Sequence, residues 1–168
     1  IILEPVAGNM GVVRPNQQFV EQLNELASAN DILMIVDEVM TGYRTKFGAT
    51  HELLGFNSDI VCLGKVIGGG FPVGAYGARN EIMEKVAPLG GMYQAGTRAG
   101  NPIAMACGIA TLKALSKRHP YADFNKTAAC LEREMKSAAK ENGVDLQVNR
   151  FGSMINPFFT SEKVVDFK

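Results

Sequence analysis

The sequence predicts an α/β fold built on a mainly parallel β-sheet. Short apolar runs alternate along the chain with segments of helical periodicity, which is the pattern of consecutive βα units. The runs are predominantly apolar, as in strands that helices cover on both faces. Of the 168 residues, 46% are hydrophobic and 20% are charged, and a chain of this composition can bury a sizeable core.

Four apolar runs are expected to form the strands of this sheet. They cover residues 1–5, 32–37, 59–63 and 73–76. Between the first two runs, apolar residues recur at helical spacing from Phe19 to Ala27, after Pro15, which predicts a crossover helix. The first run begins at residue 1 without an initiator methionine, so the chain is expected to be incomplete.

The second half of the chain predicts a change of domain. Residues 101–115 are rich in Ala, Met, Ile and Leu, with Pro102 in the first turn, and indicate a well-buried helix packed on the sheet. A long amphipathic helix follows residue 119 and ends at Gly143, and residues 144–160 are expected to form one or two strands. We therefore expect residues 1–118 to belong to a large domain and residues 119–168 to begin a smaller, truncated α+β domain.

Charge and hydropathy exclude two classes of partner. Seventeen basic and seventeen acidic residues cancel, and no run of Lys or Arg is long enough to follow a phosphate backbone, which excludes nucleic acid. No stretch reaches the roughly 20 apolar residues of a membrane span. Neither nucleic acid nor a membrane is therefore expected as a partner.

The cysteines and histidines predict no metal site. Cys62, Cys107 and Cys130 lie far apart without a Cys-x-x-Cys pair, which indicates buried free thiols in a reducing compartment, and we expect a cytoplasmic protein. His51 and His119 are the two histidines, and neither lies in a cluster of ligand-type residues.

Asp37 is the first candidate for chemistry. It closes an apolar run, so its carboxylate is expected at the carboxyl end of a buried strand, where ligands bind in open α/β sheets. A helix cap or a structural ion pair is the ordinary alternative. Together with Glu38, the run also resembles the acidic strand of a P-loop nucleotide hydrolase, which holds magnesium.

Lys65 follows the next strand, beside Val66 and Ile67 and before three glycines. Desolvation by such neighbours favours a nucleophilic amine, whereas a surface lysine is the ordinary alternative. The P-loop pattern fails here, because Asp59 stands where its first glycine belongs and Val66 where its hydroxyl residue belongs. A phosphate loop in sequence outside this chain stays open.

Gly96 and Thr97 lead directly into the helix expected at residues 101–115. Backbone N–H groups and a hydroxyl in such a position can hold a phosphate group. An ordinary helix-capping turn is the alternative, so this pair alone does not identify a phosphate site.

Five segments taken together resemble one family of enzymes. Their sequences are EPVAGNMG (4–11), DEVMTGYR (37–44), GKVIGGG (64–70), PVGAYG (72–77) and YQAGT (93–97). In order and spacing they resemble the aminotransferase-like enzymes of the type I pyridoxal-phosphate fold, and more narrowly the glutamate-1-semialdehyde 2,1-aminomutase family. The resemblance covers most of residues 1–116 and continues more weakly to the end of the chain.

This resemblance implies the two central roles of the site. Lys65 would bind pyridoxal 5'-phosphate as a Schiff base and later move a proton between substrate carbons. Asp37 would pair with the protonated pyridine nitrogen and keep it cationic, so that the ring can accept electrons. No metal ion is implied.

It also implies contacts around the ring and between subunits. Val39 would pack on one face of the ring, and Asn9 would face the ring hydroxyl. Gly96 and Thr97 would reach the cofactor phosphate of the neighbouring subunit, which implies a homodimer. The roles of Glu4, Glu38, Arg44 and Arg98 stay open between active-site and structural alternatives.

The implied reaction is an intramolecular amino transfer that converts glutamate-1-semialdehyde to 5-aminolevulinate in tetrapyrrole (porphyrin) biosynthesis, with the cofactor entering as pyridoxamine phosphate. An ω-aminotransferase that uses two separate substrates is the nearest alternative, and a nucleotide hydrolase or an inactive fragment is more remote. The chain departs from the family at Arg98-Ala99, where Leu-Ser is usual, and at Asn156-Pro157. We expect this 168-residue piece to be inactive alone, because part of the cofactor pocket is missing.

Overall fold

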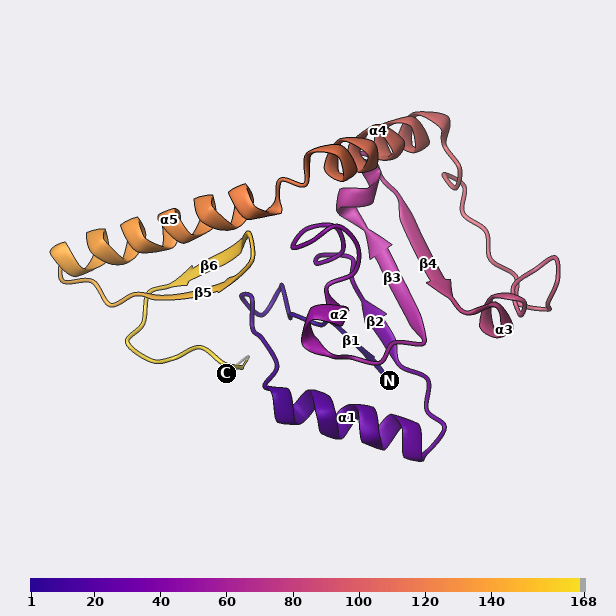
Figure 1. Cartoon of the computed structure of the whole chain (residues 1–168), viewed down its shortest axis with the longest axis horizontal. Coiled ribbons are helices and arrows are strands. Elements are labelled where there is room, and N and C mark those ends of the chain that lie inside the picture. The colour runs from indigo at the N-terminus through magenta and orange to yellow at the C-terminus, as the bar shows by residue number, and fades with distance from the viewer. Residues whose placement is uncertain (167–168) are drawn as a thin grey trace.

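The computed structural model describes residues 1–166, and its centre is a four-stranded sheet (Figure 1). The strand order is β1-β2-β3-β4, with β1, β2 and β3 parallel and β4 antiparallel to β3. The strands are β1 (Ile2–Leu3), β2 (Ile35–Asp37), β3 (Ile60–Gly64) and β4 (Gly74–Ala78). The predicted fold class and the four strands are confirmed. β1 is shorter than expected, since Pro5 has no N–H to donate to a ladder.

Helix α1 (Gln17–Ala29) is the predicted crossover between β1 and β2. The side chain of Asn16 caps it by accepting a hydrogen bond from the Phe19 N–H at 2.7 Å. Its buried residues, Val20 and Ala27, pack into one cluster with Met34 and Val36 of the β2 segment. The short helices α2 (His51–Leu54), η1 (Lys65–Gly68) and α3 (Asn80–Met83) were not predicted, because four residues carry no measurable periodicity.

Helix α4 (Pro102–Arg118) forms where predicted but is less buried than expected. Ala104 and Gly108 are buried, whereas Ile103 and Ile109 are 58% and 53% exposed. The helix touches the turn η1 closely at Gly108, where a Cβ would lie 2.4 Å from the carbonyl oxygen of Ile67. The prediction of a well-buried helix is therefore wrong for this chain, because the contact is limited to this small-residue face.

Gly108→Ala is therefore expected to destabilise the protein by about 1–3 kcal/mol, although alanine favours helix, because the added methyl meets rigid backbone. Gly77→Ala is the matched control, since a Cβ at Gly77 meets nothing within 4 Å. Chemical denaturation of the full-length variants measures the difference. An unchanged Gly108→Ala midpoint would show that α4 can move away from η1 without cost.

The C-terminal part consists of α5 (Tyr121–Glu141) packed on an antiparallel hairpin of β5 (Gln147–Phe151) and β6 (Met154–Phe158) (Figure 1). Arg150 Nε donates to Glu132 Oε2 at 2.7 Å and ties the hairpin to the helix. The predicted amphipathic helix is thus confirmed as α5; of its apolar residues Ala128 is buried, but Phe124 and Leu131 are 43% and 49% exposed. The chain turns at His119 (φ 44°), between α4 and α5, and the domain boundary there stays a prediction.

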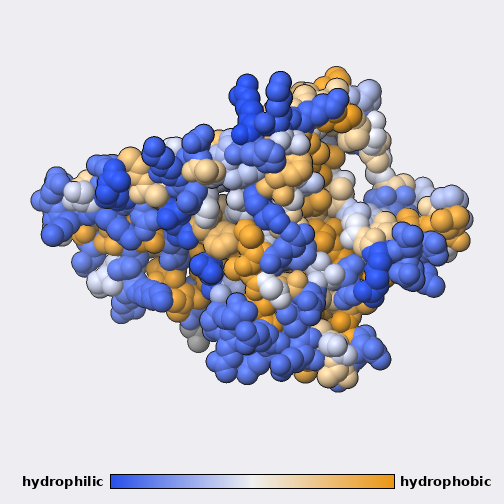
Figure 2. Space-filling model, in the orientation of Figure 1, coloured by the Kyte–Doolittle hydropathy of each residue, from blue (hydrophilic) through white to orange (hydrophobic). Residues whose placement is uncertain are grey.

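Much hydrophobic surface remains uncovered in this chain. Figure 2 shows apolar surface across the middle of one face, below α4. Leu89 and Tyr93, in the long segment between α3 and α4, are 80% and 84% exposed. All three thiols are free; Cys62 and Cys107 are half-buried, but Cys130 is exposed, so its predicted burial is wrong. No helix within residues 1–166 has the length and hydropathy to cross a bilayer.

Candidate active site at the carboxyl ends of β2 and β3

Asp37 and Lys65 lie at the same edge of the sheet. Asp37 is the last residue of β2 and stands opposite Cys62 of β3, and Lys65 follows Gly64 at the end of β3. The strands are parallel, so their carboxyl ends meet, as the sequence predicts. Burial raises the pKa of the Cys62 thiol, and the negative charge of the Asp37 carboxylate, which stands opposite it in the sheet, raises it further.

The side chain of Lys65 is exposed in this chain. Its backbone adopts φ 47° as β3 passes into η1, and the next two residues, Val66 and Ile67, are half-buried. The expected desolvation of the amine by its sequence neighbours stays a prediction for the full-length protein. The structure leaves the amine accessible at the sheet edge.

Val39 connects the two strand ends. Its backbone N–H donates to Asp37 Oδ1 at 2.8 Å, which holds the carboxylate over the turn that follows β2. A Cβ at Gly64 would lie 3.1 Å from Val39 Cγ1, so this valine packs over the residue that precedes Lys65. An aliphatic surface, a carboxylate and an amine are thus gathered at one edge.

Asn9 lies at the tip of a compact loop beside this edge. Two hydrogen bonds between Ala7 and Val13, of 2.9 and 3.1 Å, close the loop. At Gly8, a Cβ would stand 2.4 Å from the sulfur of Met40 in the turn after β2. Asn9 itself is exposed, on a loop packed against Met40.

The carboxylate of Glu4 supports the same loop. Its Oε2 accepts a hydrogen bond from the Gly8 N–H at 3.1 Å. This contact favours a positioning role for Glu4, one of the residues whose role the sequence left open.

Gly96 lines the same open groove as Val39, between β3, β4 and α4, with a volume of about 1090 Å³. Arg98 lines it too, whereas Arg44 lines a separate groove beside α5. Thr97 is exposed on the neighbouring loop, and it is not among the lining residues. The structure therefore brings Gly96, but not Thr97, to the groove.

Glu38 points away from this site and is completely buried. Its carboxylate accepts hydrogen bonds from the Thr41 hydroxyl at 2.5 Å and from the His51 N–H at 2.6 Å, and it lies 2.9 Å from His51 Nδ1. Burial alone would raise the pKa of Glu38, but these hydrogen bonds, with one from the Thr50 N–H, hold it below its ordinary value. His51 Nε2 is in turn 3.0 Å from Ser58 Oγ.

This network answers one open question and adds residues that the sequence did not reveal. Glu38 is engaged in the interior, so it cannot join Asp37 at a magnesium ion, and residues 1–166 hold no cluster of potential metal ligands. His51 and Ser58 were missed because their partner is remote in sequence. The available signal was Glu38 itself, since a carboxylate on a buried strand needs a partner.

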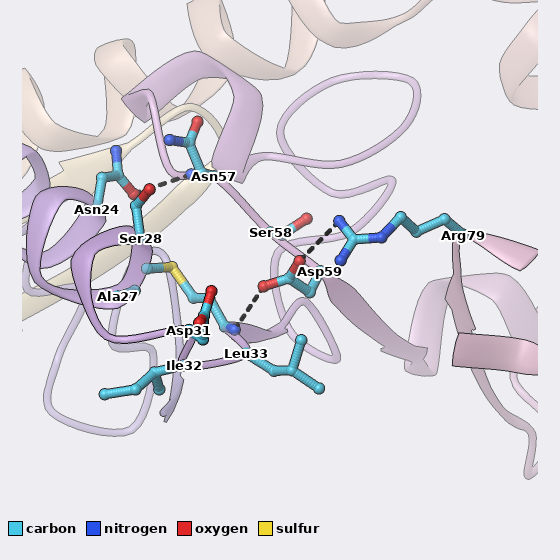
Figure 3. Close-up of a pocket in the computed structure, with 11 residues that line it drawn as sticks. Asn24, Ala27, Ser28, Asp31, Ile32, Leu33, Asn57, Ser58, Asp59 and Arg79 are labelled. Carbon is cyan, nitrogen blue, oxygen red and sulfur yellow. Dashed lines mark hydrogen bonds and ion pairs between the residues drawn. The ribbon is translucent and has the colours of Figure 1, made fainter. Parts of the chain in front are cut away.

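A polar pocket of about 510 Å³ lies at the opposite, amino-terminal ends of the strands (Figure 3). Figure 3 shows Asp59 between Leu33 and Arg79. Its carboxylate accepts from the Met34 N–H at 2.8 Å and pairs with Arg79 at 2.9 Å. These bonds join β2, β3 and the end of β4, so we interpret the pocket as structural.

Comparison with known proteins identifies the family. The sequence profile of the class-III aminotransferases matches residues 1–166. The chain belongs to the class-III aminotransferase family. This membership removes the nucleotide-hydrolase alternative, in agreement with the inward position of Glu38.

Curated relatives of this class-III aminotransferase chain include glutamate-1-semialdehyde 2,1-aminomutases. The protein of that name from Pelotomaculum thermopropionicum is 53% identical over 99% of the chain, and the one from Aquifex aeolicus is 51% identical over 100%. The chain spans 38% and 40% of their lengths. It therefore corresponds to about two fifths of such a protein.

Solved structures share the fold of the class-III aminotransferase chain. An ω-transaminase from Sphaerobacter thermophilus superimposes with a TM-score of 0.89 over 99% of this chain and 38% of its own, at 29% identity. A glutamate-1-semialdehyde aminomutase from Pseudomonas aeruginosa PAO1, solved in complex with PMP, gives 0.82 over 99% and 39%, at 25% identity. These matches confirm the type I fold predicted by resemblance.

Proposed function

We propose that the full-length protein converts glutamate-1-semialdehyde to 5-aminolevulinate by pyridoxal-phosphate-dependent intramolecular amino transfer, as a cytoplasmic homodimer. The observation that carries the proposal is the joint position of Asp37 and Lys65 at one sheet edge, within a chain about 50% identical to proteins named for this reaction. Solved relatives described with PLP or PMP bound support the choice of cofactor.

The residues at the edge fit pyridoxal phosphate. Lys65 supplies an accessible amine, Asp37 a carboxylate fixed by the Val39 N–H, and Val39 an aliphatic surface over Gly64. When bound, the cofactor supplies an electron-accepting ring that stabilises the charge left when a proton leaves a substrate carbon. A carboxylate at the position of Asp37 keeps the pyridine nitrogen protonated, and an apolar side chain excludes water from one ring face.

Lys65 would perform two tasks with one amine. Its Nζ would hold the cofactor covalently and, once released, would carry a proton between the two carbons that the transferred nitrogen joins. The structure supports this role through exposure, because an amine that must change partners needs room to move. Asn9, on the loop packed against Met40, would contact the ring hydroxyl.

In the proposed homodimer, residues of each subunit would complete the cofactor site of the other. Gly96 and Thr97 lie on an exposed segment together with Tyr93, which is 84% exposed. An uncovered aromatic residue of this size is typical of a surface that a partner covers. We propose that Thr97 reaches the cofactor phosphate of the second subunit.

The deciding experiment measures 5-aminolevulinate formation by the full-length protein, loaded with pyridoxamine phosphate, from glutamate-1-semialdehyde alone. We expect turnover without any added amino donor, because the amino group returns to the molecule that supplied the skeleton. An ω-aminotransferase, favoured as second candidate by the 0.89 TM-score, would instead require a donor for continued turnover. Strict dependence on a donor would overturn the aminomutase assignment.

A further inference from the structure

The loop that carries Asn9 is held from outside the large sheet, by the β5–β6 hairpin. Figure 1 shows the hairpin beside the early part of the chain. The side-chain amide of Asn149 in β5 donates one hydrogen bond to the Gly11 carbonyl and one to the Val164 carbonyl, both at 3.1 Å. A half-buried amide thus bridges two segments that are more than a hundred positions apart.

Phe158 of β6 holds the same point of the loop through packing. A Cβ at Gly11 would lie 2.1 Å from Phe158 Cζ, so the ring rests directly on the glycine backbone. Gly11 also adopts φ +94°, a conformation that side chains rarely allow. Both the packing of Phe158 and the positive φ therefore require glycine at position 11.

Inside the loop, backbone hydrogen bonds connect Gly11 to the turn that carries Asn9. The N–H groups of Gly11 and Val12 both donate to the Gly8 carbonyl, at 3.0 and 3.3 Å, which closes a tight turn around the tip. On the other side, Gly8 is pressed against Met40. Asn9 is thus presented by a turn clamped between the hairpin and the segment that follows β2.

We propose that Asn149 and Phe158 are positioning residues that orient Asn9 toward the cofactor ring, so that the small C-terminal unit helps to form the cofactor site of the large one. This inference rests on the proposed function, because Asn9 acquires its role only with the cofactor. The hairpin acts through the loop and does not touch the cofactor itself.

The test compares Asn149→Ala with Asn156→Ala in the full-length protein. Asn156 stands opposite Asn149 in the hairpin, but its amide donates only to the adjacent Pro157 carbonyl, so it is a matched control. Without cofactor, we expect amide hydrogen exchange in residues 7–13 to become roughly tenfold faster in Asn149→Ala and to stay unchanged in the control. The dissociation constant of pyridoxal phosphate should rise about fivefold, as for loss of one hydrogen bond.

A third variant separates positioning from general stability. In an Asn9→Ala background, Asn149→Ala should add nothing to the dissociation constant, because both changes remove the same contact. Unchanged exchange, or effects on cofactor affinity that add, would overturn the inference. If the wild-type protein bound no pyridoxal phosphate, the proposed function would fail instead, while the exchange measurement would still report whether the hairpin clamps the loop.

Discussion

Lys65→Ala in the full-length protein is expected to reduce 5-aminolevulinate formation by at least about 10²–10⁴-fold, the range for loss of a positioned acid–base group. Alanine has no amine to hold the cofactor or to carry a proton between the carbons that the transferred nitrogen joins. The structure places this amine, exposed, next to the Val39–Gly64 contact and at the same edge as Asp37. Borohydride reduction followed by peptide mapping should find the cofactor on Lys65 in the wild-type protein only.

Lys140→Ala is the control for this experiment. Lys140 is an exposed lysine in the last turn of α5, on the C-terminal part of the chain. It should keep wild-type turnover and the same reduced adduct. If the adduct and the activity survived in Lys65→Ala, another amine would hold the cofactor and the central assignment would be lost.

The positions of Asp37 and Lys65 could be predicted because they depend on local pattern and one general rule. Each residue follows an apolar run, and parallel strands bring their carboxyl ends together. The place of Val39 over Gly64 follows from the same register, since both are close to those strand ends. The relative positions of Asp37, Val39 and Lys65 are therefore determined by short segments of the sequence.

Other features depend on contacts between remote segments, which no local pattern contains. Lys65 is exposed at the left-handed start of η1, and α4 is partly exposed because it contacts η1 through small residues such as Gly108. The Asn149–Gly11 bond likewise joins residues whose proximity is decided by the whole chain. Sequence periodicity identifies faces of elements, and it does not reveal what covers them.

Glu38→Ala is expected to destabilise the full-length protein by about 3–5 kcal/mol, the cost of removing one partner from a buried, hydrogen-bonded charge. The substitution leaves the Thr41 hydroxyl, the His51 N–H and His51 Nδ1 without their acceptor in the interior. Because Glu38 directly follows Asp37, the turn that carries Val39 should loosen as well. Chemical denaturation of the cofactor-free protein at neutral pH measures the loss.

The contribution of Glu38 to stability should depend on pH. The folded-state pKa of Glu38 lies below its ordinary value of 4.5, so the carboxylate stabilises the fold above pH 4.5 and loses that contribution as pH falls toward the lowered pKa. The difference between the wild-type protein and Glu38→Gln should therefore be largest near neutral pH and shrink below 4.5. Glu52→Gln, at an exposed ion pair with Lys46, should change stability by less than about 0.5 kcal/mol. A wild-type advantage over Glu38→Gln that did not vary with pH would mean that the pKa of Glu38 is the same in the folded and the unfolded protein. An advantage that shrank as pH rose above 4.5 would mean that the folded protein holds Glu38 as a neutral acid.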